Sequence, residues 1–416
     1  MKTTRTLVVW LLAIMISSSG FIACSDDSPK DLNIESIMIG TIDLNGATSP
    51  ADVPVKPTIV FTFNSNVDAA TATTSNVKLT QDYDNTDVAI QVTASGKTLS
   101  VTPVDNLGSG TLYKISVSEG LLNDDKQPLA ATTRTFTTAG TFSPAGILAH
   151  YTFEDNSNDA TGMFNPSASG VVDISYSAGR NANAGKAATF NGTTSIIEIP
   201  NGDDLIKSND LTLSFWMKTN SADKTSGHFV MGLGAFYGIG YEVFGGYDGA
   251  KFAVRYNLSD TSSTAEDMWF PSEATDASNG GWQGWDFAKS LTVEQMTALL
   301  KDNWVHVTLT YDATERKGTL YYNAEKMKSF DFDLWPDGDA KRVVSGVTYA
   351  GVAPEVVNEF AFGFNQSRAG TLWDAEGWGG YDFPGANHFK GQLDDIKFYH
   401  KVLTANEIKL MYDSEK

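Results

Sequence analysis

The stretch Phe389-Lys-Gly-Gln-Leu-Asp-Asp-Ile-Lys-Phe-Tyr-His-Lys-Val-Leu-Thr-Ala-Asn-Glu-Ile408 predicts a strand followed by a short helix. Strand alternation places Asp394 on the same face as Ile396 and Phe398. Because a buried carboxylate without a partner is costly, we expect backbone donors, a basic residue or a metal ion beside Asp394. Thr404, with a glutamate three residues later, has the spacing of a capping box at the start of the helix.

The N-terminus carries the features of an export signal. Lys2 and Arg5 precede an apolar run, residues 7–16, that is too short to span a bilayer. The segment ending in Ala23-Cys24 resembles a bacterial lipobox, and Cys24 is the only cysteine of the chain, so it cannot form an internal disulfide. We therefore expect a lipoprotein signal peptide at residues 1–23, lipidation of Cys24, and a polar tether at residues 24–32.

The chain is strongly acidic, with a formal net charge of −20. Such a charge disfavours nucleic acid and anionic lipid surfaces as partners. Asp26 and Asp27 resemble the acidic export signals of surface lipoproteins in Gram-negative glycan degraders, although a solvated spacer would have the same composition. The expected location is the outer membrane, facing the cell exterior, with membrane contact only through the lipid anchor.

Residues 33–139 alternate short apolar strands with Gly, Asn, Asp and Pro turns, which is typical of a small antiparallel β-sandwich. The phrases Ile59-Val-Phe-Thr-Phe63, Leu99-Ser-Val-Thr-Pro103 and Tyr113-Lys-Ile-Ser-Val-Ser118 resemble bacterial Ig-like modules. The resemblance implies that this domain acts as a spacer. A linker at residues 140–146 carries two Gly and one Pro and ends the domain.

Residues 147–416 contain a second, larger set of strands. Tyr151-Thr-Phe-Glu-Asp155, Gly185-Lys-Ala-Ala-Thr-Phe-Asn-Gly192, Leu211-Thr-Leu-Ser-Phe-Trp-Met217 and Gly391-Gln-Leu-Asp-Asp-Ile396 occur in this order. Together they resemble a laminin-G-like, concanavalin A-like jelly roll of the bacterial kind. The fold class is thus expected to be all-β: an Ig-like β-sandwich followed by a concanavalin A-like jelly-roll sandwich, with short helices in insertions. One such helix is predicted after Thr292, which forms a capping box with Gln295.

Two aromatic insertions are the leading candidates for a binding site. They lie at about residues 257–302 and 371–384, and Gly beside Trp is more typical of a loop that displays a ring than of a core strand. Because sugar rings pack on Trp and Tyr, a glycan platform is the functional interpretation, whereas rings that only attach the loops to the sandwich are the structural one. The candidate ligand-binding residues are Trp282, Trp285, Trp373, Trp378 and Tyr381.

A structural calcium ion is the second candidate. The turn after Tyr151-Thr-Phe153 is rich in oxygen ligands of the kind calcium prefers, and it could reach the closing strand if the first and last strands pair. The family resemblance makes Asp155, Asp159, Asp394 and Asp395 the candidate ligands of Ca2+. An Asx-rich turn that satisfies its own backbone is the alternative.

Three classes of function remain open. Our leading hypothesis is a surface protein that captures a poly- or oligosaccharide without turnover, with neighbouring outer-membrane glycan-uptake proteins as candidate partners. A glycoside hydrolase or polysaccharide lyase would need a pair of carboxylates, for which Asp374 with Glu376 or Glu266 with Asp267 are candidates. A protein-binding adhesin or assembly subunit is the third class, and fold analogy alone does not choose among them.

Overall fold

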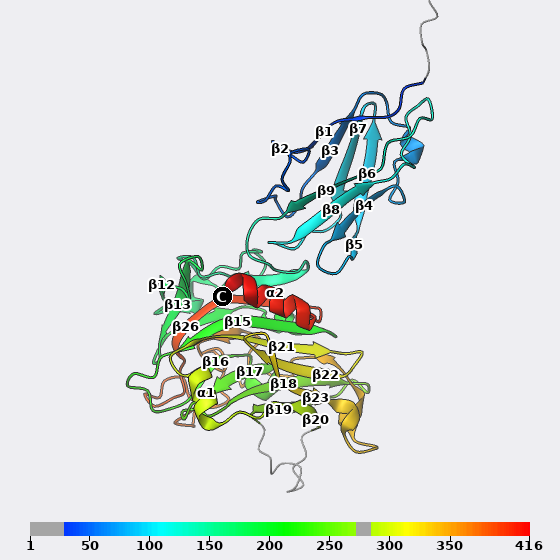
Figure 1. Ribbon diagram of the computed structural model, residues 1–416. Helices are drawn as coiled ribbons and strands as arrows, with labels where there is room; N and C mark the ends of the chain where they lie inside the picture. The colour runs from blue at the N-terminus through cyan, green and yellow to red at the C-terminus, as the bar shows by residue number, and fades with distance from the viewer. Residues whose placement is uncertain (1–28, 272–283) are drawn as a thin grey trace, which may run out of the picture.

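A computed structural model describes residues 29–271 and 284–416 of the chain. Within these ranges the structure is almost entirely β, with two α-helices, so the all-β prediction is confirmed. Figure 1 shows an elongated N-terminal domain next to a larger sandwich, with α2 of the sandwich on the side that faces the N-terminal domain. Within the described ranges, no helix combines the length and the apolar character needed to cross a membrane.

The N-terminal domain has two antiparallel sheets, with strand orders β2-β1-β3-β7-β6 and β5-β4-β8-β9. Its core is a separate cluster that includes Ile59, Phe61, Phe63, Leu99 and Tyr113, the alternating residues that the sequence placed inside. The elements are β1 Ile34–Ile39, β2 Ile42–Asp43, β3 Ile59–Phe63, η1 Ala69–Thr71, β4 Val77–Gln81, β5 Asp87–Val88, β6 Ile90–Ser95, β7 Thr98–Pro103, β8 Leu112–Val117 and β9 Thr132–Thr137.

The larger domain stacks two sheets. The first has the order β12-β13-β26-β15-β21-β22-β23-β20, with β10 also paired to β26. Its strands are β10 Ile147–Tyr151, β12 Ser175–Ala178, β13 Lys186–Asn191, β15 Leu211–Thr219, β20 Trp285–Ala288, β21 Trp304–Asp312, β22 Lys317–Tyr322, β23 Glu325–Asp331 and β26 Lys390–Tyr399. β10 pairs with β26, so the first and last strands of the domain lie side by side, which is the condition stated for the turn after Phe153 to reach the closing strand.

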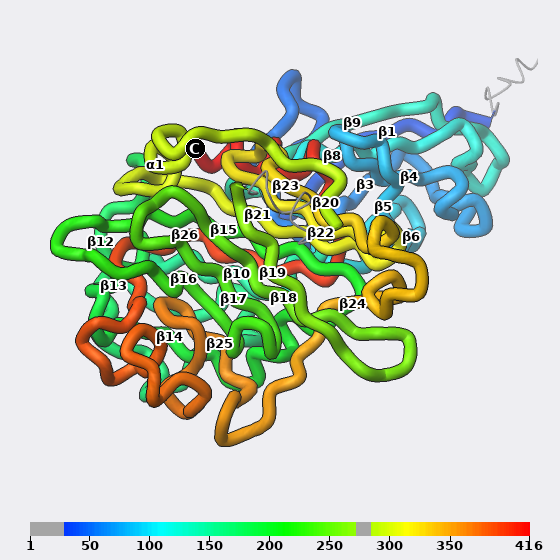
Figure 2. Tube along the Cα trace, turned by 90° about the horizontal axis from the view of Figure 1, so that it is seen from below, coloured from blue at the N-terminus to red at the C-terminus, as the bar shows by residue number. Residues whose placement is uncertain are grey.

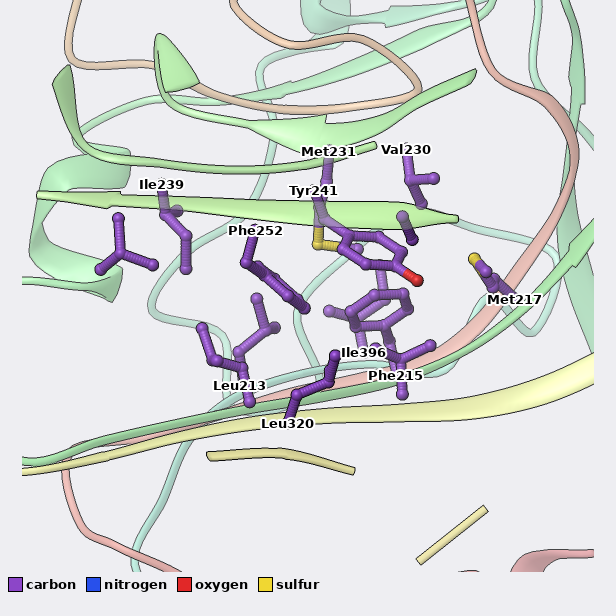
Figure 3. Packing of buried hydrophobic residues seen from close by; sticks show 14 of the residues in the cluster. Leu213, Phe215, Met217, Val230, Met231, Ile239, Tyr241, Phe252, Leu320 and Ile396 are labelled. Atoms are coloured by element: carbon purple, nitrogen blue, oxygen red, sulfur yellow. The ribbon is translucent and has the colours of Figure 1, made fainter. Parts of the chain in front are cut away.

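The second sheet has the order β11-β14-β25-β16-β17-β18-β19, with β24 also paired to β18. Its strands are β11 Val171–Val172, β14 Ile196–Ile199, β16 His228–Gly232, β17 Ile239–Val243, β18 Ala250–Leu258, β19 Ser263–Phe270, β24 Val344–Val347 and β25 Phe360–Phe362. Figure 2 shows β16, β17, β18 and β19 as neighbours in this layer. Side chains from both sheets interdigitate between the layers, as Figure 3 shows for Phe215, Tyr241, Phe252 and Ile396.

The helices are short and lie outside the sheets. They are η2 Ala168–Gly170, η3 Gly202–Leu205, η4 Ala235–Tyr237, α1 Val293–Leu300, η5 Phe332–Leu334, η6 Ala340–Val343 and α2 Ala405–Glu415. Both predicted capping boxes are present, Thr292 with Gln295 at α1 and Thr404 with Glu407 at α2. These caps fix where each helix begins, because they satisfy backbone N–H groups that the helix itself leaves unpaired.

A bulge in β26 changes which residues face the core. The register with β15 shifts between Ser214 and Trp216, and Asp395 has a φ of 45°. The extra residue reverses the alternation, so Leu393, Ile396 and Phe398 all reach the core between the sheets. The prediction that Asp394 shares a face with Ile396 and Phe398 is therefore wrong: Asp394 projects to the opposite side, toward the C-terminal residues of α2.

Candidate functional site

The loop at residues 371–387 is attached to the second sheet at several points. The Tyr381 hydroxyl donates to the carbonyl of Thr194, and the Phe229 amide donates to the carbonyl of Asn387 at 2.6 Å. Inside the loop, the Asn387 amide donates to the Trp378 carbonyl at 2.9 Å. These bonds hold the loop beside β16, and the orange-red segment containing it lies at this side of the sheet in Figure 2.

Two tryptophans of this loop form one wall of a groove of about 290 Å3. The rings of Trp373 and Trp378 lie 5.8 Å apart between centroids, at an interplanar angle of 51°. Phe236 packs against Trp373 at 6.3 Å, and Phe229 packs against Trp378 at 6.1 Å. Trp378 is nevertheless 45 % exposed, so the loop displays part of this ring rather than burying it.

Glycines make close packing of the loop and the floor possible. A Cβ atom on Gly379 would lie 2.8 Å from the Cβ of Trp373, and one on Gly240 would lie 2.6 Å from Oδ1 of Asn365. On the neighbouring strand, a Cβ atom on Gly232 would also lie 2.6 Å from Oδ1 of Asn365. The Asn365 side chain therefore lies over two glycines of β16 and β17 at the floor of the groove.

The polar part of the floor comes from β17 and β18. Core residues alternate with outward ones on these strands, so Glu242 and Lys251 project away from the core and into the groove. Lys251 Nζ lies 3.4 Å from Glu242 and 3.1 Å from Asp267 of β19. Burial alone would lower the pKa of Lys251, but the two carboxylates raise it above its ordinary value. Burial raises the pKa of Glu242, against the opposing effect of Lys251.

This arrangement is suited to an uncharged, hydroxylated ligand with apolar faces. Exposed aromatic rings offer flat apolar surface, while an amide, a carboxylate and an ammonium group can fix hydroxyl groups. Of the predicted aromatic residues, Trp373 and Trp378 lie together in the groove. Trp282 lies outside the described residues.

The other two predicted aromatic residues lie elsewhere. Trp285, on β20 of the first sheet, packs partly buried against the core, and its indole N–H is buried without a hydrogen-bond partner in the part of the chain that the structure describes. Tyr381 packs against His388 at 4.7 Å and Phe364 at 5.4 Å, and burial raises its pKa to about 12. Neither residue lines the groove with Trp373 and Trp378.

The carboxylates predicted to bind calcium have other partners. Asp159 accepts hydrogen bonds from the backbone amides of His150, Thr161, Met163 and Phe164 and from the Thr161 hydroxyl, the pattern of an Asx-rich turn. Burial alone would raise its pKa, but these bonds lower it below the ordinary value. On the surface, the carboxylate of Asp155 lies 2.6 Å from Lys186 Nζ.

Asp394 and Asp395 share one arginine. Arg180, in the turn between β12 and β13, lies 2.5 Å from Asp394 and 2.7 Å from Asp395. Asp395 also lies 2.8 Å from Nε2 of His150. Of the partners considered for Asp394 from the sequence, the structure shows a basic residue, Arg180, and a backbone donor, the amide of Asp395.

Each of these four carboxylates has hydrogen-bond or ion-pair partners within the fold. Among residues 29–271 and 284–416, no group of three or more His, Cys, Asp or Glu side chains could hold a metal ion. Calcium therefore remains a prediction from the sequence, and chelation tests it. A lower melting temperature in EDTA would support a bound ion, and an unchanged one would leave Arg180 as the counter-charge.

The sheet contributes residues to the site that the sequence pattern did not indicate. Phe229, Glu242 and Lys251 come from three consecutive strands, and Asn365 comes from a turn about 110 residues later in the chain. A signal was present in Glu242 and Lys251, because each is a charged residue between two apolar residues of its strand. Their mutual position depends on the strand register, which a single sequence does not give.

Comparisons with known proteins agree with this architecture. Residues 40–138 match the family model of a bacterial Ig-like domain, and residues 191–358 match that of the concanavalin A-like lectin/glucanases superfamily. The fold is thus an Ig-like β-sandwich followed by a concanavalin A-like sandwich, and each contains one of the two matched regions. The concanavalin A-like match includes Phe229, Glu242 and Lys251, whereas Trp373 and Trp378 follow it. No curated protein matches the sequence.

Several solved structures resemble the chain at low sequence identity. The binding domain of Paraclostridial Mosquitocidal Protein 1 is 15 % identical with a TM-score of 0.40, covering 65 % of this chain and 52 % of its own. The ligand-binding domain of botulinum neurotoxin serotype D in complex with N-acetylneuraminic acid is 11 % identical (TM-score 0.38; coverage 64 % and 50 %). This chain thus spans about half of those two chains.

A third structure is covered almost completely. Domain 4 of AbnA, a GH43 extracellular arabinanase from Geobacillus stearothermophilus in complex with arabinotriose, is 20 % identical with a TM-score of 0.35. The match covers 64 % of this chain and 98 % of that domain.

Proposed function

We propose that this protein captures a poly- or oligosaccharide at the cell surface, without turnover, through the groove formed by Trp373 and Trp378. Its support is the combination of two partly exposed tryptophan rings with a polar floor, on a domain of the concanavalin A-like class. The Ig-like domain would hold this groove away from the membrane. Lipidation of Cys24, which lies outside the described residues, would anchor the chain in the outer membrane.

The observation that carries the proposal is the exposure of Trp378 beside Trp373. A tryptophan that only attached a loop to the sandwich would gain stability from complete burial. Trp378 instead keeps 45 % of its surface exposed at the edge of a groove with polar groups on its floor. Ligand sites typically combine aromatic walls with a few convergent polar groups in this way.

Affinity electrophoresis tests the proposal directly. The full mature chain is run in gels that contain arabinan, xylan, galactomannan, mixed-linkage β-glucan, polygalacturonate or alginate. We expect retardation by at least one polysaccharide, and loss of that retardation in Trp373→Ala and Trp378→Ala. Phe287→Ala is the matched control, because Phe287 is a similarly exposed ring, 41 %, on the first sheet. Absence of retardation in every gel would contradict the proposal.

A hydrolase on the same groove is the second candidate. Glu242 and Asp267 both lie beside Lys251 Nζ, at 3.4 Å and 3.1 Å, so the two carboxylates are close neighbours, and glycosidases use a pair of nearby carboxylates. Burial raises the pKa of Glu242, as a general acid requires. This candidate predicts new reducing ends from one polysaccharide, abolished in Glu242→Gln, whereas capture without turnover predicts none.

The carboxylate pairs chosen from the sequence are less suitable. Glu266 and Asp267 are neighbours on β19 and therefore project to opposite faces of the sheet. Glu266 is paired with Lys341, while Asp267 is paired with Lys251. Asp374 and Glu376 are both exposed in the loop that carries the tryptophans.

A further inference from the structure

Trp269 is an exposed aromatic residue that the groove described above does not include. It lies on β19 and is 43 % exposed. Its neighbours in the strand, Met268 and Phe270, point into the core between the sheets, so Trp269 projects to the outer face of the second sheet. Phe244 supports the ring at a centroid distance of 5.1 Å.

The strand register connects Trp269 to the groove. Trp269 is the cross-strand partner of Lys251, Lys251 is the partner of Glu242, and Glu242 is the partner of Phe229. Directly opposite residues project to the same face of a sheet, so the four side chains form one row across β16, β17, β18 and β19. With neighbouring strands about 4.8 Å apart, this row is roughly 14 Å long.

Aromatic rings lie at both ends of the row. At one end Phe229 packs against Trp378, and at the other end Trp269 is open to solvent. The distance between these ends exceeds the size of one sugar ring. A ligand that contacts both must therefore be an oligosaccharide that crosses the strands.

The charged groups between the two ends are one lysine and two carboxylates. Lys251 Nζ lies within 3.4 Å of Glu242 and within 3.1 Å of Asp267, and 4.9 Å from the centroid of the Trp269 ring. Two carboxylates and one ammonium group leave this part of the row with one net negative charge. A sugar carboxylate placed here would be repelled, whereas neutral hydroxyl groups can hydrogen-bond to all three side chains.

We propose that Trp269 forms a second aromatic subsite, and that the ligand is an electrically neutral oligosaccharide that runs across β16 to β19 from Trp378 to Trp269. This inference rests on the proposed function, since it extends the same groove. It assigns a role to a residue outside the platform of Trp373 and Trp378, and it specifies the length and charge of the ligand.

The test compares ligands of different length by isothermal titration calorimetry. Arabino-, xylo-, manno- and cello-oligosaccharides are used as disaccharides and as hexasaccharides, with the wild-type chain and with Trp269→Ala. For the series that binds, we expect Trp269→Ala to weaken hexasaccharide binding on the order of tenfold and to leave disaccharide binding at Trp373 and Trp378 unchanged. Trp269→Phe, which keeps a ring, should recover most of the affinity.

The control for the loss of exposed aromatic surface is Phe287→Ala. Each of the two rings has a lysine ammonium group above it: Lys326 Nζ lies 4.9 Å from the centroid of Phe287, and Lys251 Nζ lies 4.9 Å from that of Trp269. This variant should bind hexasaccharides like the wild type. Equal hexasaccharide affinities of wild type and Trp269→Ala would overturn the second subsite while leaving the proposed function intact. If the wild type bound no oligosaccharide and no polysaccharide, the proposed function itself would fail.

The charge of the ligand is tested separately. Wild type should not be retarded in gels with polygalacturonate or alginate, and the double variant Glu242→Gln, Asp267→Asn should gain retardation there, because Lys251 then lacks its counter-charges. Retardation of the wild type by either acidic polysaccharide would overturn the neutral-ligand part of the proposal.

Discussion

Arg180 donates from Nη1 to the Asp394 carboxylate at 2.5 Å, and their side chains are only 4 % and 1 % exposed. The same guanidinium reaches Asp395 with Nη2, and its Nε donates to the backbone carbonyl of Glu415 at 2.7 Å. Arg180 therefore joins the bulge of β26 to the end of α2. Burial alone would raise the pKa of Asp395, but Lys397, His150 and Arg180 hold it well below its usual range.

Replacement of Arg180 by Ala should strongly destabilise the protein. The variant removes the guanidinium that Asp394 and Asp395 share and leaves Asp395 with only Lys397 and His150. Breaking a buried ion pair in this way typically costs about 3–5 kcal/mol. We expect a fall of that size in the free energy of unfolding, measured by urea denaturation monitored by tryptophan fluorescence.

Arg316→Ala is the matched control for that experiment. Arg316 also binds a carboxylate with two nitrogens, that of Asp333, but both side chains are substantially exposed. Its loss should cost no more than about 1 kcal/mol. Equal destabilisation by the two variants would contradict the structural role given to Arg180.

The sequence predicted the need for a partner at Asp394 but not its direction. Alternation assumes a continuous strand, whereas the positive φ of Asp395 inserts a bulge that turns Asp394 away from the core. The adjacent acidic residues Asp394 and Asp395 were the available signal, because alternation would place one of them inside the sandwich, where a carboxylate needs a partner. Arg180 could not be identified, since its proximity depends on the pairing of β13 with β26.

The aromatic residues around the groove were likewise predictable only in part. Gly-rich spacing around Trp373 and Trp378 indicated a displayed loop, because such sequences pack poorly as strands. Trp269, in contrast, lies within a strand, and a strand residue faces the core or the solvent according to a register that one sequence does not reveal. The sequence Met268-Trp269-Phe270 consists of three apolar residues, so it did not reveal which of them face the core and which faces solvent.

Acid should destabilise the protein through His306. Burial, then Lys397 and Arg180, lower the pKa of this histidine to about 3, whereas a histidine in the unfolded chain titrates near 6.5. The neutral form thus stabilises the fold fully above about pH 6.5, and this contribution is lost progressively as the pH falls toward 3, at about 1.4 kcal/mol per pH unit. His228 and His388 shift in the same direction, to about 3 and about 4.

The variant His306→Gln isolates this effect. Its free energy of unfolding should fall less steeply than that of the wild type between pH 6 and pH 4, by about 1.4 kcal/mol per pH unit. Urea denaturation at a series of pH values measures both slopes. Carboxylates contribute equally to both proteins, so identical slopes would contradict the assignment to His306.

The Ig-like domain should be docked rather than freely tethered. Tyr83 of that domain donates to Glu407 of α2 at 3.1 Å and packs edge-on against Phe142 of the linker at 5.3 Å. Phe142 belongs to a small apolar cluster with Ile408 and Met411 of α2. We expect Tyr83→Ala to increase the rate at which a protease cleaves the linker at residues 140–146, and Tyr83→Phe to lie between this variant and the wild type. An unchanged cleavage rate would indicate that Tyr83 does not couple the domains.

Asn365 should contribute a hydrogen bond to the bound glycan. Its side-chain amide has no hydrogen-bond partner among the described residues, although the residue lines the groove and is only 6 % exposed. A hydrogen bond to a neutral ligand is worth about 1 kcal/mol, so Asn365→Ala should weaken binding of the retained polysaccharide roughly fivefold in affinity electrophoresis. Because the amide has no partner within the fold, the melting temperature of the variant should stay within about 2 °C of the wild type. A large fall in melting temperature with unchanged affinity would show instead that Asn365 supports the turn above Gly232 and Gly240.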